Sequence, residues 1–198
     1  MTISANEHFP QLTPVEYLEW EAQQELRYEF LDGRISAMNS DQQDSARMRH
    51  DRITANFYDL LQARLECTVC RVFNSTIKVQ ILESNAFCYP DLSVSSNVRD
   101  RSANNFITHP CLIVEVGSPR SDVSERIEKF GLYRQVATLE EYVLVSTDKI
   151  GLDVYQRNAL GSWDIRGYES GATIELQSIN FTFEIDRIYE DRVVEIEA

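Results

Sequence analysis

The segment CLIVEV, residues 111–116, constrains the fold more than any other part of the chain. Three consecutive apolar residues, Leu112 to Val114, are typical of a strand that is buried on both faces of a sheet. Ser118-Pro119 ends this strand, and Asp122 with Glu125 suits the N-cap and third position of a helix that reaches about Gln135. A doubly buried strand followed by a helix predicts an α/β domain.

Local signals predict the elements on either side of this unit. Thr13-Pro14-x-Glu16 forms a capping box, which begins a helix that ends near Glu25, with Val15, Leu18 and Trp20 on its apolar side. Asp32-Gly33 joins two short apolar runs, 28–31 and 34–38, as a β-hairpin.

Helical spacing of Ile53, Phe57, Leu60 and Leu61 predicts a second helix over about 46–65. We expect residues 1–198 to form a single domain of α/β (α+β) class, in which helices flank a mixed central β-sheet. Further strands are expected at 69–73, 76–82, 91–95, 141–145, 152–155, 163–167 and 173–176.

Composition limits the class of protein. The 198 residues contain 43% hydrophobic side chains, but no apolar run approaches the length that crosses a bilayer. The first residues lack the basic and apolar regions of a signal peptide, so we expect a cytoplasmic protein with no membrane partner. In that reducing compartment the four cysteines are expected to be thiols.

The net charge of −13 argues against nucleic acid as a partner, because phosphate binding depends on Lys and Arg. The charge is uneven along the chain. Residues 1–46 hold two basic and nine acidic side chains, and residues 135–198 hold five basic and thirteen acidic ones. Residues 47–134 hold twelve basic and ten acidic ones, so the middle of the chain is slightly positive and compatible with a local basic groove.

Three carboxylates occupy positions where a charge is costly. Asp91 follows Tyr89-Pro90 at the start of a strand, Glu115 interrupts the apolar run, and Glu29 lies between two aromatic residues. Carboxylates in a sheet are unfavourable unless they are paired or bind a metal. Asp and Glu from neighbouring strands, with a backbone carbonyl and water, supply the oxygen ligands that Mg²⁺ prefers.

A basic face follows on the next helix, where Arg126, Lys129 and Tyr133 recur at helical spacing. A strand glutamate followed by a helix lysine brings a cation to the side of a metal site. That arrangement suits phosphodiester hydrolysis, which requires an activated water and neutralisation of the charge developing on phosphate.

The order Pro90-Asp91, then Glu115-Val116, resembles the signature of the PD-(D/E)XK nuclease superfamily. Gly117 stands where a lysine is expected, and Lys129 fits the branch in which this lysine has moved to the following helix. That branch is the Uma-type family of restriction endonuclease-like proteins. The resemblance extends over most of the chain, through Thr13-Pro14-x-Glu16-Tyr17, Tyr28-Glu29-Phe30-Leu31-Asp32-Gly33, His50-x-x-Ile53, Tyr89-Pro90-Asp91-Leu92, Ile113-Val114-Glu115-Val116, Lys129-x-x-x-Tyr133-Arg134 and Glu141-Tyr142-Val143-Leu144-Val145.

The resemblance implies a restriction endonuclease-like fold and a role for each matching residue. Asp91, Glu115 and the Val116 carbonyl would bind Mg²⁺, for which Mn²⁺ can substitute. Lys129 would orient the attacking water or stabilise the transition state, and Glu29 would stand at the edge of the metal site. The implied activity is hydrolysis of nucleic acid, with DNA as the expected substrate, by a homodimer. The candidate substrate-binding residues are His50, Arg126 and Tyr133.

Each residue also has a simpler interpretation. Asp91 is equally suited to a turn after proline, Glu29 to a pair with Arg34 across the hairpin, and Lys129 to a solvated helix face. Tyr133 suits the core, and His50 suits a helix cap or surface position.

The spacing Cys67-x-x-Cys70 lacks a second such pair, which favours ordinary buried thiols over zinc ligands. The alternative function is a non-catalytic module that keeps the nuclease fold and binds nucleic acid or a protein partner.

Overall fold

The computed structural model describes residues 12–31, 33–38, 44–117 and 123–191. Its three α-helices are α1 (Pro14–Glu21), α2 (Asp44–Leu65) and α3 (Val123–Tyr133). Within these ranges no helix has the length and apolar character needed to cross a membrane. Short 3-10 segments occur at η1 (Asp100–Ser102), η2 (Gln177–Ile179) and η3 (Ile185–Ile188).

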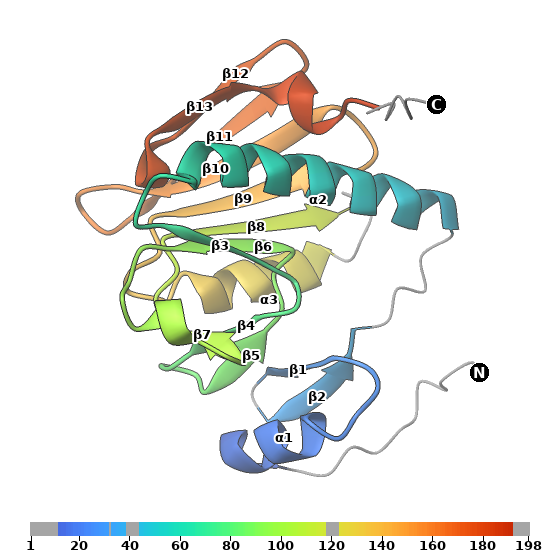
Figure 1. Cartoon of the computed structure of the whole chain (residues 1–198), viewed down its shortest axis with the longest axis vertical. Helices are drawn as coiled ribbons and strands as arrows, with labels where there is room; N and C mark the ends of the chain where they lie inside the picture. Colours follow the sequence, from blue (N-terminus) through green and yellow to red (C-terminus); the bar gives the residue numbers. More distant parts are fainter. Residues whose placement is uncertain (1–11, 32, 39–43, 118–122, 192–198) are drawn as a thin grey trace.

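A six-stranded sheet forms the centre of the molecule (Figure 1). Its strand order is β11-β10-β9-β8-β6-β3, and only the β8–β9 pair among these neighbours is parallel, so the sheet is mixed as predicted. The strands are β3 (Arg71–Asn74), β6 (Leu92–Ser95), β8 (Leu112–Gly117), β9 (Glu141–Ser146), β10 (Gly151–Arg157) and β11 (Trp163–Glu169).

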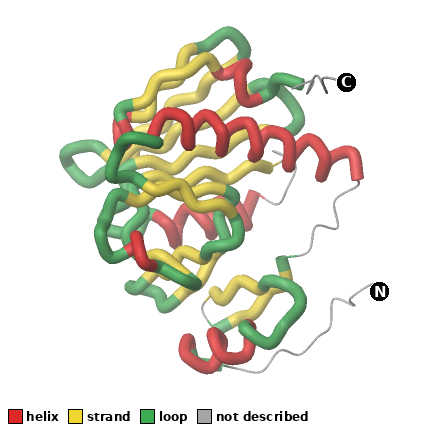
Figure 2. Tube along the Cα trace, viewed as in Figure 1, coloured by secondary structure: helices red, strands yellow, loops and turns green. Residues whose placement is uncertain are grey.

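Two smaller sheets lie on either side of this centre (Figure 2). The first has the order β2-β1-β5-β4-β7 and contains the predicted hairpin, and the second pairs β12 with β13. Gly33, in the hairpin turn, has φ +76°, a region that favours glycine. The strands are β1 (Tyr28–Leu31), β2 (Arg34–Ala37), β4 (Lys78–Ile81), β5 (Ala86–Cys88), β7 (Phe106–Ile107), β12 (Thr173–Leu176) and β13 (Phe181–Glu184).

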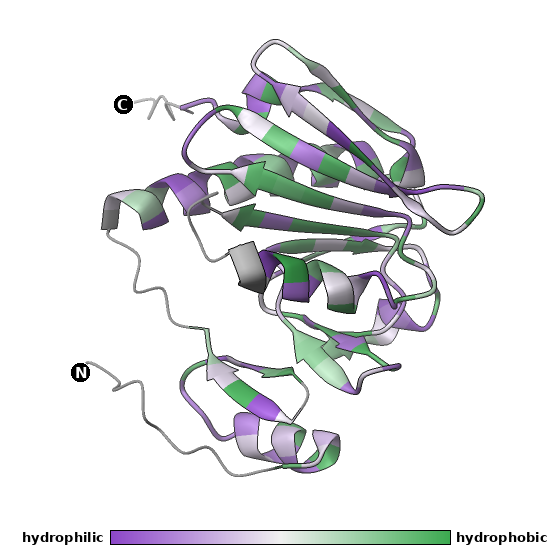
Figure 3. Ribbon diagram, turned by 180° about the vertical axis from the view of Figure 1, so that it is seen from behind, coloured by the Kyte–Doolittle hydropathy of each residue, from purple (hydrophilic) through white to green (hydrophobic). Residues whose placement is uncertain are grey.

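Strand β8 is buried on both faces, as the apolar run predicted. Leu112 and Val114 pack into the cluster formed with α2 and the β12–β13 sheet. Ile113 packs into a second cluster on the side of α3. Because side chains alternate along a strand, Glu115 falls on the same face as Ile113, toward α3. Figure 3 shows this side, with α3 in the foreground next to the largely apolar strands of the central sheet.

The first helix differs from its prediction. The capping box between Thr13 and Glu16 is present, but α1 ends at Glu21 and not near Glu25. Val15, expected on the apolar face, is 66% exposed, whereas Tyr17 and Glu21 are buried. Tyr17 and Glu21, four residues apart, lie on the face of the helix that is turned toward the hairpin. A search for apolar periodicity does not reveal this face, because Glu21 is a carboxylate.

Candidate active site

Four side chains from separate segments meet between α3 and the sheets. Glu29 lies on β1, Asp91 directly before β6, Glu115 on β8 and Lys129 on α3. The Nζ atom of Lys129 lies 3.2 Å from Oε1 of Glu29 and 3.7 Å from Oε1 of Glu115. The structure therefore brings together the residues that the sequence proposed as catalytic, although they span a hundred positions of the chain.

The pairing of β6 with β8 places Asp91 beside Glu115. The two strands are antiparallel with Leu92 opposite Val114, so the residue before Leu92 faces the residue after Val114. The Val116 N–H then donates to Oδ2 of Asp91 at 2.7 Å. Asp91 thus binds the backbone of β8 and is not a simple turn residue.

Glu29 is held by groups outside its own hairpin. Its partner in the hairpin register is Ser36, whereas Arg34 lies opposite Leu31, so the suggested Glu29–Arg34 pair is wrong. Glu29 accepts a hydrogen bond from the Tyr89 N–H at 3.0 Å, in addition to its contact with Lys129. It is 6% exposed and faces the site.

Tyr133 is part of the same cluster. It is fully buried, and its hydroxyl donates to Oε1 of Glu115 at 2.9 Å. The sequence offered it as a substrate-binding residue or as a core residue. Its place in the core, with its hydroxyl on Glu115, favours a role in orienting that carboxylate.

His50 contacts the site and is not a cap or free surface residue. Its Nε2 atom lies 3.0 Å from Oδ1 of Asp91, although His50 comes from α2 on the opposite face of the sheet from α3. The hydrogen bond to Asp91 raises the pKa of His50 to about 9, against the opposing effect of burial. His50 is therefore an imidazolium that partly neutralises Asp91 at neutral pH.

Burial and mutual repulsion of the carboxylates perturb the cluster. Burial raises the pKa of Glu115, Lys129 opposes this effect, and Asp91 and Glu29 add to it. Burial also disfavours the charge of Lys129, but Glu115 and Glu29 outweigh it and raise the pKa of Lys129 well above its usual range. Glu29 and Glu115 thus contact Lys129, and Asp91 contacts His50, so three carboxylates face two cations and the remaining negative charge favours a further cation.

The donor set fits a small, hard cation such as Mg²⁺. In the ranges that the structure describes, no group of three or more His, Cys, Asp or Glu side chains is arranged to hold a metal. A metal here would instead bind two carboxylates, Asp91 and Glu115, with the Val116 carbonyl and water completing the oxygen shell, which is the usual coordination of Mg²⁺. The side chains of Asp91 and Glu115 are 14% and 13% exposed, so neither is sealed from solvent.

The cysteines form no such site. All four are free thiols, as predicted. Cys88 and Cys111 are buried, but Cys67 is exposed and Cys70 is half-buried, so the expectation of buried thiols is wrong for Cys67. Cys67 lies in the turn that follows α2, where the chain is on the surface.

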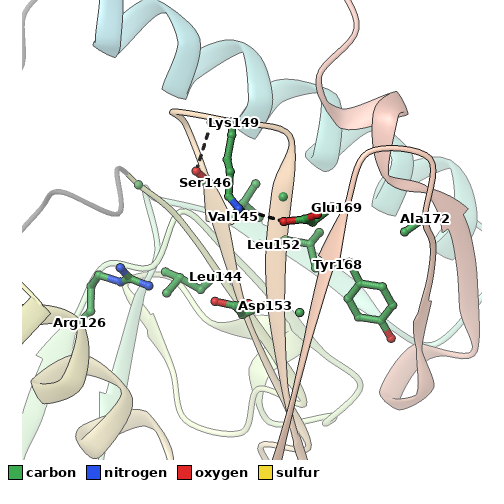
Figure 4. A pocket seen from close by; sticks show the side chains of 13 residues that line it. Arg126, Leu144, Val145, Ser146, Lys149, Leu152, Asp153, Tyr168, Glu169 and Ala172 are labelled. Atoms are coloured by element: carbon green, nitrogen blue, oxygen red, sulfur yellow. Dashed lines mark hydrogen bonds and ion pairs between the residues drawn. The ribbon is translucent and has the colours of Figure 1, made fainter.

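Arg126 is on α3, three positions before Lys129. It lines a cavity of about 650 Å³ together with Gly117, Lys149 and Asp153 (Figure 4). Among the residues that the structure describes, the buried Nε atom of Arg126 has no hydrogen-bond partner. Gly117 follows Glu115 by two positions on β8, but neither Asp91 nor Lys129 lines the cavity.

The mixed sheet, with two strand carboxylates and a helix lysine at one edge, defines a restriction endonuclease-like fold. A crystal structure described as "a putative nuclease belonging to DUF820", from Anabaena variabilis, matches with a TM-score of 0.72 at 17% identity, over 90% of this chain and 97% of that one. The chain belongs to the Uma2 family, described as "Putative restriction endonuclease", whose model matches residues 14–187.

Two relatives come from Synechocystis sp., and both are uncharacterised proteins. One is 38% identical over 181 residues, covering 91% of this chain and 93% of the relative. The other is 30% identical over 154 residues, covering 77% of this chain and 84% of the relative. Family membership therefore supports a nuclease in general terms.

The His50–Asp91 contact predicts a pH-dependent contribution to stability. Because the pKa of His50 is raised from 6.5 to about 9, its protonated form stabilises the fold fully below pH 6.5, and this contribution is lost as the pH rises through 9. We expect His50→Gln to be less stable than the wild type at pH 6, with a smaller difference at pH 10. Urea denaturation at both pH values measures the difference in free energy of unfolding between variant and wild type. A difference that grows with pH would contradict a protonated His50 paired with Asp91.

Proposed function

We propose that the chain is a Mg²⁺-dependent endonuclease that hydrolyses phosphodiester bonds of DNA. The observation that carries the proposal is the convergence of Glu29, Asp91, Glu115 and Lys129 on one point, from four segments. Carboxylates that could hold a hard cation, next to a lysine, match the needs of a reaction in which negative charge develops on phosphate.

In this proposal each side chain has a defined task. Asp91 and Glu115 would hold Mg²⁺, and the chemistry that the ion would supply there is Lewis-acid stabilisation of charge on the phosphate. Lys129, placed between two carboxylates, stays protonated and stabilises charge on the phosphate oxygens. The attacking water forms a new P–O bond and loses a proton, while the bond to the leaving sugar oxygen breaks and that oxygen takes up a proton.

Local charge supports nucleic acid as the substrate despite the acidic chain. The first turns of α2 extend beyond the ends of β8 and β9 (Figures 1 and 3), and they carry Arg47, Arg49 and Arg52 around His50. Arg47 and Arg49 are exposed. Cations in the first turns of a helix oppose its dipole, so their presence there favours a role in binding an anion.

The test is cleavage of plasmid and single-stranded DNA with Mg²⁺ or Mn²⁺. Asp91→Asn keeps an oxygen for the Val116 N–H but removes the charge, so we expect a loss of about 10²- to 10³-fold. Asp164→Asn, an exposed position on β11, is the matched control and should cleave at the wild-type rate.

If Asp91→Asn cleaves DNA at the same rate as the wild type, the proposal is wrong. Absence of cleavage by the wild type in every condition would favour the alternative, a non-catalytic module that keeps the fold. The homodimer stays a prediction, which light scattering at micromolar concentration can check.

A further inference from the structure

A second buried polar cluster lies next to the site. Glu21 at the end of α1, Lys78 at the start of β4 and Tyr89 after β5 are each less than a tenth exposed. The Nζ atom of Lys78 donates to Oε2 of Glu21 at 2.6 Å and to the Tyr89 hydroxyl at 2.9 Å. The Tyr89 hydroxyl in turn donates to Oε1 of Glu21 at 2.5 Å. The three groups close a ring of hydrogen bonds.

Tyr89 connects this ring to the candidate site. Its side chain belongs to the ring, while its backbone N–H donates to Oε1 of Glu29 at 3.0 Å. Only Pro90, whose ring restricts the backbone, separates it from Asp91. Tyr89 therefore contacts Glu29 and precedes Asp91 by two positions.

Glu29 lies on a strand whose register with the rest of its sheet is short, although the aromatic cluster of Tyr17, Phe30 and Phe87 also packs there. Strand β1 meets β5 at a single register pair, Phe30 with Phe87. Figure 1 shows α1 and the hairpin at one end of the molecule. The ion pair of Glu21 with Lys78 joins this group to β4, next to the Phe30–Phe87 contact.

An ion pair is a poor way to gain stability at this place. Removing two charges from water is costly, and hydrophobic side chains of similar volume often stabilise a fold equally well or better. What hydrophobic side chains lack is direction, since only hydrogen bonds fix the Tyr89 hydroxyl relative to Glu21 and Lys78.

We propose that Tyr89, held by Glu21 and Lys78, is a positioning residue that sets the places of Glu29 and Asp91. This inference rests on the proposed function, in which both carboxylates take part in phosphodiester hydrolysis. It assigns to α1 and the hairpin the task of completing the site from outside the central sheet.

Two backbone amides report the positions directly, without substrate or metal. The Tyr89 N–H is bonded to Glu29, and the Val116 N–H is bonded to Asp91. In the double variant Glu21→Met, Lys78→Met no lone charge is left buried, so the fold should be kept. We expect hydrogen exchange at these two amides to become about tenfold faster relative to the Val143 amide in the core, because the hydrogen bonds that protect them open more often.

The same variant should bind Mn²⁺ about 10- to 100-fold more weakly in calorimetry, as expected when groups behind metal ligands are removed. Tyr89→Phe removes the hydroxyl alone and should change both amides in the same direction, which keeps the test valid if the double variant does not fold. Lys149→Met, in an exposed ion pair with Glu169, is the matched control and should change neither amide.

The inference is overturned if both variants fold and both amides keep their wild-type exchange relative to Val143. Failure of the wild type to bind Mn²⁺ would count against the proposed function. The amide measurement would still decide the positioning role, so the two failures are distinguishable.

Discussion

Glu115→Gln is expected to abolish metal-dependent cleavage, a loss of at least about 10³-fold, while the protein stays folded. The substitution keeps the size of the side chain and an oxygen that can accept the Tyr133 hydroxyl hydrogen bond. It removes one of the two carboxylates proposed to hold Mg²⁺. Cleavage assays on the purified variant, beside circular dichroism to verify the fold, measure the effect. A residual rate above a tenth of the wild type would contradict the assignment of Glu115.

The same variant should be more stable than the wild type at alkaline pH. Burial raises the pKa of Glu115 above its ordinary 4.5. At pH values between 4.5 and this raised pKa, the native state binds more protons than the unfolded state. Wild-type stability therefore falls as the pH rises through this interval, and the glutamine variant escapes the loss. Lys129 keeps its other partner, Glu29, at 3.2 Å.

Urea unfolding at pH 4.5 and pH 9 tests this sign. We expect little difference between variant and wild type at the lower pH, and a more stable variant at the higher one. A variant that is less stable than the wild type at pH 9 would show that the Lys129–Glu115 attraction outweighs the burial of Glu115. Loss of activity with a gain in stability would mark Glu115 as a group kept for chemistry and not for the fold.

Among the substitutions proposed for the carboxylate cluster, Lys129→Met should give the largest decrease in the free energy of unfolding. The Nζ atom contacts both Glu29 and Glu115, and the side chain is only 15% exposed. Removing one partner from a buried ionic group leaves uncompensated charge and costs about 3–5 kcal/mol. Cleavage should fall with it by about 10²- to 10³-fold, because charge on the phosphate loses its cation.

Two comparisons separate this effect from a general effect of losing lysine. Lys149→Met removes an exposed cation from an ion pair and should change the free energy of unfolding by less than about 0.5 kcal/mol. Adding Glu115→Gln to Lys129→Met should recover part of the lost stability, since one of the two orphaned carboxylates is then neutral. Strict additivity of the two substitutions would contradict a direct interaction between the side chains.

The sequence predicted the part of the fold that depends on local pattern. Continuous apolar residues identified β8 because a strand buried on both faces needs them, and the interruption at Glu115 was conspicuous for the same reason. The order of Asp91, Glu115 and Lys129 likewise follows from consecutive elements. In contrast, the short strands β5, β7 and β13 were missed, since two to four residues carry too little periodicity to be recognised.

The unpredicted parts of the site depend on contacts between distant segments. The His50–Asp91 contact joins α2 to the residue before β6 across 41 positions, and although the family resemblance singled out His50, nothing in the local pattern indicates this contact. Glu21 was hidden for a related reason, because a carboxylate on a helix is usually solvated. Only its burial against Lys78 shows otherwise.

The assembly of the carboxylate cluster from segments far apart has a consequence for synthesis. Glu29 leaves the ribosome well before its neighbours Tyr89, Glu115 and Lys129, and α3 ends at Tyr133. A nascent chain that stops before α3 has three carboxylates without their lysine, and burying them together would be unfavourable. The complete cluster can therefore close only after α3 has emerged, so chains that stop before α3 cannot form the site.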